Sequence, residues 1–107
     1  MTQEKLAIIL RKLNRALKRL LGERLEAIYL YGSHARGDAR PDSDIDVLVV
    51  IKGDFNYFDM VHKVSRHTAK LSLEYDTVIS CVYVTKEDYE HRCTPLLLNI
   101  RREGVAV

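Results

Sequence analysis

Apolar side chains recur at helical spacing near the start of the chain. These positions are Leu6, Ile9, Leu10, Leu13, Ala16, Leu17, Leu20 and Leu21. Thr2 is a suitable N-cap for such a helix, and Gly22 is a suitable residue for its C-terminal cap. The pattern therefore predicts an amphipathic first helix whose leucine stripe packs on a core.

Three further stretches are rich in β-branched and aromatic residues, which predicts β-strands. The first strand is expected at Leu25–Tyr31, the second at Asp44–Lys52, and the third roughly at Tyr75–Val84. Within the second strand, residues 47–51 are apolar on both faces. This strand is therefore expected in the interior of the sheet.

A second amphipathic helix is predicted between the second and third strands. Either Asp54 or Asn56 would cap its start, and its end should lie near Leu73 or Glu74. The stripe expected to face the core consists of Phe58, Val61, Val64, Ser65, Thr68 and Leu71.

The last part of the chain predicts two short helices and a final strand. Thr85 begins a capping pair, and Thr94 followed by Pro95 marks a second helix start. That helix would extend to Gly104, with a short strand at residues 105–107. The order of elements predicts an α/β (α+β) sandwich, in which a small mixed β-sheet is flanked by helices.

Length and composition indicate one domain, residues 1–107, with a single core. No stretch approaches the roughly 18 consecutive apolar residues that a membrane span requires, and the charged start is not typical of a signal peptide. Cys81 and Cys93 lack the paired spacing of a disulfide framework or a zinc site. These features favour a cytoplasmic protein with reduced thiols and no contact with a membrane.

Positive charge is concentrated at the start of the chain. Residues 1–24 carry a net charge of +5, whereas the whole chain carries +2, so the remainder carries −3. A basic helix can contact nucleic acid or an acidic partner. The plainer interpretation is a solvated helix face, and nucleic acid is not expected among the partners.

The stretch YGSHARGDARPDSDIDVLVV, from Tyr31 to Val50, carries the clearest candidate chemistry. Asp44 and Asp46 are two residues apart at the start of a predicted strand, so their carboxylates should project from the same face. Two like charges held that close repel each other unless a cation lies between them. Their oxygen ligands suit a hard divalent ion, above all Mg²⁺.

Gly32 and Ser33 lie upstream of this pair, at the end of the first predicted strand. A glycine lets the backbone approach a ligand closely, and a serine adds a hydroxyl donor. If a helical turn begins there, its free N–H groups form a phosphate site. Phosphate donors beside metal ligands are what a nucleoside triphosphate carrying Mg²⁺ requires.

The composite motif GSHARGDARPDSDIDVLVV resembles the signature of the DNA polymerase beta-like nucleotidyltransferase superfamily, in which Gly-Ser precedes Asp-x-Asp. The chain length and the spacing from ARG to SD resemble the minimal nucleotidyltransferase branch of that superfamily. Members of this branch are commonly paired with HEPN-type partners in toxin–antitoxin modules. The resemblance implies a nucleotidyltransferase fold and a nucleotidyltransferase enzyme.

The resemblance also implies roles for the carboxylates. Asp44 and Asp46 would bind Mg²⁺, two ions in the usual arrangement, and a third carboxylate on the next core strand would complete the site beside the attacking oxygen. Asp76 is the best match, because the apolar strand begins directly after it. Glu74, two residues earlier, is the rival for this third catalytic and metal-binding position.

The same resemblance implies a set of nucleotide-binding residues. Gly32 and Ser33 would hold the β- and γ-phosphates of ATP. Arg36 could reach a phosphate or brace the loop through one of its aspartates, and both roles stay open. Ser43 would cap or orient the aspartate loop, and His34 is expected to be a solvent-exposed loop residue.

The resemblance implies transfer of AMP from ATP to a hydroxyl, that of a tyrosine, on a HEPN-type partner protein, with this chain as the antitoxin. The alternative is a non-catalytic binding module that neutralises its partner by complex formation. Acceptor recognition would come from the partner or from a second copy of the chain. The sequence fixes neither the nucleotide base nor the oligomeric state.

Overall fold

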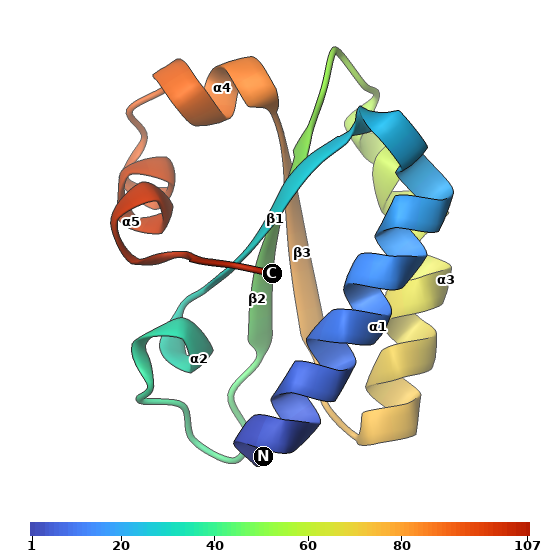
Figure 1. Ribbon diagram of the computed structural model, residues 1–107, viewed down its shortest axis with the longest axis vertical. Coiled ribbons are helices and arrows are strands. Elements are labelled where there is room, and N and C mark those ends of the chain that lie inside the picture. The colour runs from blue at the N-terminus through green and yellow to red at the C-terminus, as the bar shows by residue number, and fades with distance from the viewer.

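A four-stranded mixed sheet forms the centre of the computed structural model, which describes residues 1–107 (Figure 1). Its strands are β1 (Leu25–Tyr31), β2 (Ile45–Ile51), β3 (Ile79–Thr85) and β4 (Val105–Ala106), in the spatial order β3-β2-β1-β4. β2 is parallel to β3 and antiparallel to β1, and β4 is antiparallel to β1. The predicted mixed sheet is confirmed.

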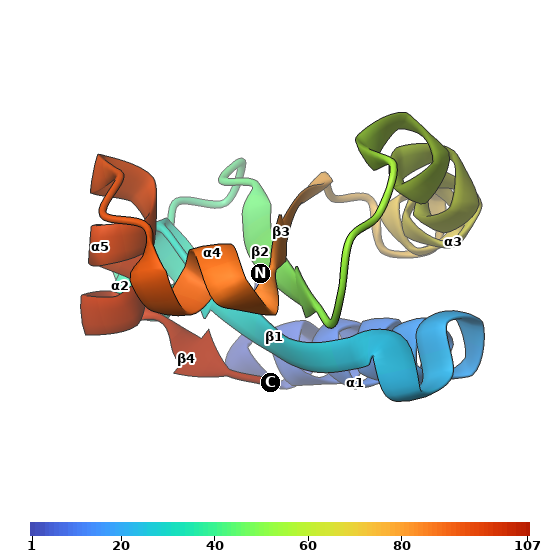
Figure 2. The same ribbon diagram turned by 90° about the horizontal axis from the view of Figure 1, so that it is seen from above.

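Helices flank the two faces of this sheet. They are α1 (Gln3–Leu21), a 3-10 turn (Gly22–Arg24), α2 (Ser33–Arg36), α3 (Tyr57–Tyr75), α4 (Lys86–His91) and α5 (Pro95–Glu103). α1 and α3 lie on one side of the strands, and α4 and α5 lie on the other (Figures 1 and 2). None of the helices combines the length and the apolar character needed to cross a membrane.

The central strand, β2, is buried on both faces, as its sequence predicts. Val47, Val49 and Ile51 belong to the larger core cluster, which α1 and α3 cover. Leu48 and Val50 belong to a smaller cluster with Leu97 and Ile100 of α5. Two apolar faces on one strand require helices on both sides of the sheet, which accounts for the sandwich.

Side-chain caps fix four of the helix starts. Thr2, Asn56, Thr85 and Thr94 each accept a hydrogen bond from the backbone N–H three residues later, at 3.0–3.3 Å. The sequence left two candidates for the start of α3, and the structure selects Asn56 over Asp54. Polar caps at these starts satisfy N–H groups that have no partner within the helix.

The predicted start of the third strand at Tyr75 is wrong. α3 continues through Tyr75, and β3 begins only at Ile79. Asp76 caps the helix in the left-handed region, with φ 49°, and its N–H donates to the carbonyl oxygen of Ser72. Packing of Leu71 and Tyr75 against the larger core outweighs the local β propensity of the segment, and aspartate tolerates the left-handed conformation.

The predicted core stripe of α3 is also partly wrong. Phe58 is 76% exposed and Val61 is 40% exposed, whereas Met60, Val64 and Leu71 are buried. Met60 and Val64 are four residues apart, and Val64 and Leu71 are seven apart, so all three lie on one face of the helix. The sheet thus contacts a face of α3 that is rotated from the one the sequence favoured.

Candidate functional site

The turn after β1 brings a glycine against a carboxylate. Tyr31, the last residue of β1, pairs with Asp46 of β2, and Gly32 follows at φ 75° and ψ −155°. Only glycine adopts this backbone region without strain. A Cβ added at Gly32 would lie 2.5 Å from Oδ2 of Asp46, so the carboxylate occupies the space of the missing side chain.

A helical turn does begin after Gly32, which was the condition for a phosphate site at this position. α2 begins directly after Gly32, whose carbonyl oxygen accepts hydrogen bonds from the N–H groups of Ala35 and Arg36, at 3.1 and 3.0 Å. The N–H groups in the first turn of a helix have no acceptor within the helix. Those of Ser33 and His34 therefore provide the donors expected of a phosphate site, beside the Asp46 carboxylate.

Asp44 and Asp46 act on each other electrostatically. Asp44 is exposed just before β2, and Asp46 is half-buried as the second residue of the strand. Burial raises the pKa of Asp46, the negative charge of Asp44 raises it further, and His34 and Arg36 lower it. Two carboxylates that repel each other in this way form a donor set suited to a hard cation such as Mg²⁺.

The third carboxylate does not join this pair. No group of three or more carboxylate, imidazole or thiol side chains is close enough to hold a metal ion together. Asp76 lies at the end of α3, where it lines a cavity of about 410 Å³ with Ser43 and Thr77. Its predicted place on the third strand fails because the strand begins three residues later.

Glu74, the rival candidate, is part of an ion pair between helices. Its Oε1 lies 2.9 Å from Nζ of Lys12, which also lies over the ring of Tyr75 at 4.8 Å from the centroid. The pKa of Glu74 is lowered chiefly by its hydrogen bond from Lys12. Glu74 thus contacts α1 on the opposite side of the sheet from Asp46.

The residue next to Asp46 on the neighbouring strand is Ser80. β2 and β3 are parallel, and their register pairs Asp46 with Ser80, just as it pairs Leu48 with Val82. Paired residues share a face, so a half-buried hydroxyl occupies the position where the resemblance implies a carboxylate. Sequence reasoning missed Ser80, although its alternation with Val82 and Val84 was the signal that could have found it.

Hydrogen bonds brace the loop between α2 and β2. Oγ of Ser43 accepts from the N–H of Arg40 at 2.8 Å, a bond within the loop that precedes the aspartates. Nε2 of His34 donates to the carbonyl oxygen of Ser43 at 3.3 Å. Because a carbonyl only accepts, that bond places the proton of neutral His34 on Nε2.

Arg36 braces the same region from the other side. Its Nε lies 3.3 Å from Oδ2 of Asp38, and its Nη1 lies 3.9 Å from Oε2 of Glu103 at the end of α5. Of the two roles that the sequence left open for Arg36, bracing of the loop through an aspartate is present. These exposed contacts are weak individually, so a phosphate could compete for the guanidinium.

His34 differs from its prediction, and Tyr31 is a site residue that the sequence did not predict. His34 is half-buried in α2 rather than a solvent-exposed loop residue, and it faces the carboxylate pair closely enough to lower the pKa of Asp46. Tyr31, at the end of β1, has a raised pKa because of burial and the nearby charge of Asp46. Its position directly before Gly32 was the only sequence signal.

The candidate site is open. Asp44 is exposed and Asp46 is half-buried, and neither lines the cavity that joins His34 to the start of α1. Small-molecule sites are usually concave and enclose most of their ligand. An exposed carboxylate next to a half-buried one instead leaves room for a large acceptor.

Comparison with known proteins places this geometry in context. Residues 10–102 match the model of a family described as nucleotidyltransferase domain. Two proteins of Methanocaldococcus jannaschii, provisionally named protein adenylyltransferases MJ0141 and MJ0604, are 31% and 40% identical to the chain. The matches cover 73% of the chain and 78% of MJ0141, and 67% of the chain and 66% of MJ0604.

Solved structures share the fold at lower identity. A provisionally named minimal nucleotidyltransferase matches with a TM-score of 0.68 and 22% identity, over 100% of this chain and 97% of that one. A toxin–antitoxin structure with AMP-PNP matches at TM-score 0.60 and 21% identity, over 99% and 72%. A complex of a tri-AMPylated Shewanella oneidensis HEPN toxin with MNT antitoxin matches at TM-score 0.55 and 20% identity, over 92% and 70%.

Proposed function

The chain belongs to the nucleotidyltransferase domain family, and from this premise we propose that it transfers AMP from ATP to a hydroxyl of a partner protein. The two M. jannaschii relatives named for protein adenylyltransfer support a protein as the acceptor. We further propose that the acceptor is a tyrosine of a HEPN-type toxin and that the chain acts as its antitoxin in the cytoplasm. The likeness to MNT antitoxins in complex with HEPN toxins supports this choice.

The observation that carries the proposal is the contact between Gly32 and Asp46. It joins the start of α2, which can bind phosphate, to a carboxylate pair that can bind a divalent cation. A triphosphate with its Mg²⁺ needs both sites at adjacent positions. The pairing of Tyr31 with Asp46 fixes this distance through the sheet rather than through a loop.

In the proposed reaction the acceptor oxygen forms a bond to the α-phosphorus, and the bond from that phosphorus to the pyrophosphate oxygen breaks. Asp44 and Asp46 would hold Mg²⁺, which when bound would neutralise phosphate charge and favour in-line displacement. Gly32 and Ser33 orient the β- and γ-phosphates through their backbone and hydroxyl. His34 and Arg36 add donors beside the same carboxylate.

Ser80 bears on where the acceptor proton goes. A serine hydroxyl in register with Asp46 is a weak base and does not serve as a third metal-binding carboxylate. We propose that the acceptor protein supplies the base that takes the proton of its own hydroxyl. The open site allows a side chain of another protein to approach the carboxylates.

The test uses the purified chain, ATP labelled at the α-phosphate, Mg²⁺ and the HEPN-type protein encoded beside it. Label should appear on that protein, and D44N and D46N should each reduce transfer at least a hundredfold, because each removes a metal-binding charge. D42N changes the charge of the same loop two residues before the pair and should retain activity within about threefold. Absence of label with every nucleoside triphosphate would contradict the proposal.

A second candidate function is neutralisation of the partner by complex formation without transfer, which the serine at position 80 favours. In that case D44N and D46N would still neutralise the partner in cells. If the chain acts by transfer, both variants should lose neutralisation while D42N keeps it. Growth of cells producing the HEPN-type protein with each variant distinguishes the two functions.

A further inference from the structure

The positive charge of the protein gathers in one layer. α1 and α3 together carry nine lysines and arginines against three acidic residues, a net charge of +6. Since the whole chain carries +2, the rest of it carries −4. α1 and α3 lie on one side of the sheet, and α4 and α5 lie on the other (Figure 2). Asp46 points to the side of α4 and α5.

Five cations form what we call the basic ridge, along the solvent side of α1. They are Arg11, Lys12, Arg15, Lys18 and Arg19, and all five are exposed. At a rise of 1.5 Å per residue they lie within about 12 Å of helix axis. Only Lys12 has an acidic partner, Glu74. Like charges at four-residue spacing destabilise a helix, so the ridge is costly unless it binds an anion.

A groove of about 660 Å³ follows one side of the basic ridge. Lys12, Arg15 and Arg19 line it from α1, and His67 and Lys70 line it from α3. Ala16 and Leu71 are its only apolar lining residues. Glu74 also lines the groove and pairs with Lys12, so Arg15, Arg19 and Lys70 are the cations in it that have no acidic partner.

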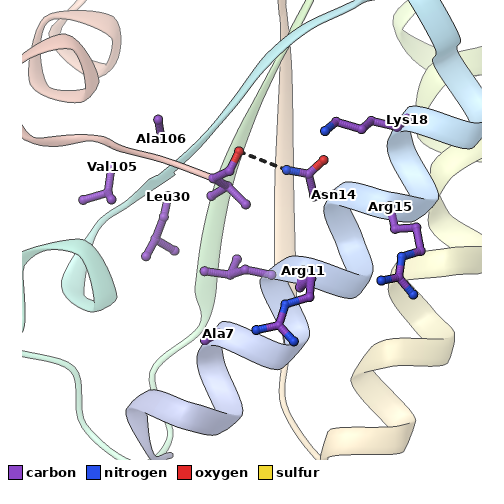
Figure 3. A pocket seen from close by; sticks show the side chains of 10 residues that line it. Ala7, Arg11, Asn14, Arg15, Lys18, Leu30, Val105 and Ala106 are labelled. Carbon is purple, nitrogen blue, oxygen red and sulfur yellow. Dashed lines mark hydrogen bonds between the residues drawn. The ribbon is translucent and has the colours of Figure 1, made fainter.

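A pocket of about 500 Å³ lies on the other side of the ridge, between α1 and the sheet edge (Figure 3). Arg11, Arg15 and Lys18 form its rim. Ala7, Leu10, Leu30 and residues 105–107 supply apolar surface, so this pocket differs from the groove in having a hydrophobic floor.

Asn14 lines this pocket and carries one unpaired acceptor. Its Nδ2 donates to the carbonyl oxygen of Val107 at 3.0 Å, the bond drawn in Figure 3, which fixes the orientation of the amide. Its Oδ1 is buried and has no hydrogen-bond partner. A buried acceptor without a donor is unfavourable, so Asn14 is a polar position on the wall of an otherwise apolar floor.

We propose that the basic ridge and the pocket bind single-stranded nucleic acid. The ridge takes consecutive phosphates, while one base enters the pocket beside Asn14 and lies against Leu10 and Leu30. Bases of a duplex are stacked and paired, so only a single strand can present one in this way. The proposal departs from the expectation from sequence, because the structure adds the cations of α3 and a pocket to those of the first helix.

Other polyanionic surfaces fit less well. A helix that binds a membrane surface inserts its apolar face, but Leu6, Ile9, Leu13, Leu17 and Leu21 of α1 are buried in the core. The centre of a protein–protein interface is depleted of charge and enriched in aromatic residues. The ridge and groove show the reverse composition.

The test is fluorescence anisotropy with labelled 20-nucleotide RNA and DNA strands in 50–200 mM salt. The double variant R15E/K18E should bind at least tenfold more weakly. R15A/K18A should lower the slope of log K against log salt by about 1.4, since each phosphate contact on a single strand contributes about 0.7. K52E/R92E changes the net charge equally outside α1 and α3 and should bind within twofold of the natural chain.

Two further measurements separate base binding from charge. Inorganic polyphosphate of equal charge should compete at least tenfold less well than the strands, and N14A should weaken binding to the strands but not to polyphosphate. D44N/D46N should bind the strands unchanged, so the outcome is independent of the proposed transferase activity. The proposal is overturned by equal binding of duplex or polyphosphate, by stronger binding to anionic vesicles or polyglutamate, or by an equal loss in K52E/R92E. Thermal melting confirms that each variant is folded.

Discussion

At the scale of single residues, Gly32 determines the candidate site. Its backbone conformation is one that other residues adopt only with strain, and the carboxylate of Asp46 fills the space of its missing side chain. A conformational need and a steric need therefore coincide at one position. Position 32 should therefore tolerate substitution less well than a position where glycine only shapes a turn.

G32A should abolish binding of ATP with Mg²⁺ because its Cβ would displace Asp46, and it should also lower the free energy of unfolding by about 1–3 kcal/mol. G22A is the matched control, since Gly22 also has a positive φ, 55°, but no atom lies within 4 Å of its added Cβ. G22A should lose stability yet bind the nucleotide normally. Titration calorimetry and thermal denaturation separate the effects, and normal nucleotide binding by G32A would contradict the steric role.

The two cysteines should differ sharply in reactivity. Burial raises the pKa of the Cys81 thiol to about 11, because it disfavours the charged thiolate, whereas Cys93 is exposed. At pH 8 about one Cys81 thiol in a thousand would then be ionised. Iodoacetamide at pH 8 should label Cys93 in the native protein and Cys81 only after unfolding, as mass spectrometry would show. Early labelling of Cys81 would indicate that β3 opens readily.

At the scale of elements, local signals located the helix ends to within two residues but misplaced the start of β3. A capping side chain acts within three residues, so Thr2, Asn56 and Thr94 identify helix starts from sequence. The end of α3 depends instead on packing against α1, including Lys12 over the ring of Tyr75. That difference explains why the cap of α3 could be predicted from sequence, whereas the start of β3 could not.

Removing the cap of α3 tests this account. N56A should lower the free energy of unfolding by about 1 kcal/mol, which for a chain of this size corresponds to a fall in Tm of about 4–8 °C. Asp54 offers a control two residues away, because its backbone carbonyl accepts from Arg24 but its side chain caps nothing. D54A should change the stability by less than about 0.5 kcal/mol. Similar losses in both variants would mean that Asn56 acts through something other than the cap.

At the scale of the whole molecule, the sheet separates the larger core from the candidate site. The larger core lies between the sheet and α1 with α3, while the candidate site lies at the end of the other face, beyond the cluster around Leu97 and Ile100. The net charge divides in a similar way, because α1 and α3 together are positive and the rest of the chain is negative. The larger core and the basic ridge therefore lie on one side of the sheet, and the two carboxylates lie on the other.

Truncation in the larger core should affect the whole chain. Leu13 of α1 is fully buried among sheet residues, so L13A should cost about 2–5 kcal/mol in free energy of unfolding. Leu98 of α5 is 48% exposed, and L98A should cost well under half as much. Chemical denaturation of both variants measures the difference. Equal losses would show that the smaller layer contributes as much to stability as the larger one.

The sequence by itself determined the first helix, strands β1 and β2, the helix caps and the motif from Tyr31 to Val50, because these depend on short-range periodicity and on residues close along the chain. Tertiary structure decided which face of α3 is buried and where β3 begins. It also placed Ser80 rather than Asp76 beside Asp46. Strand register and helix rotation depend on contacts between distant segments, and no local pattern encodes them.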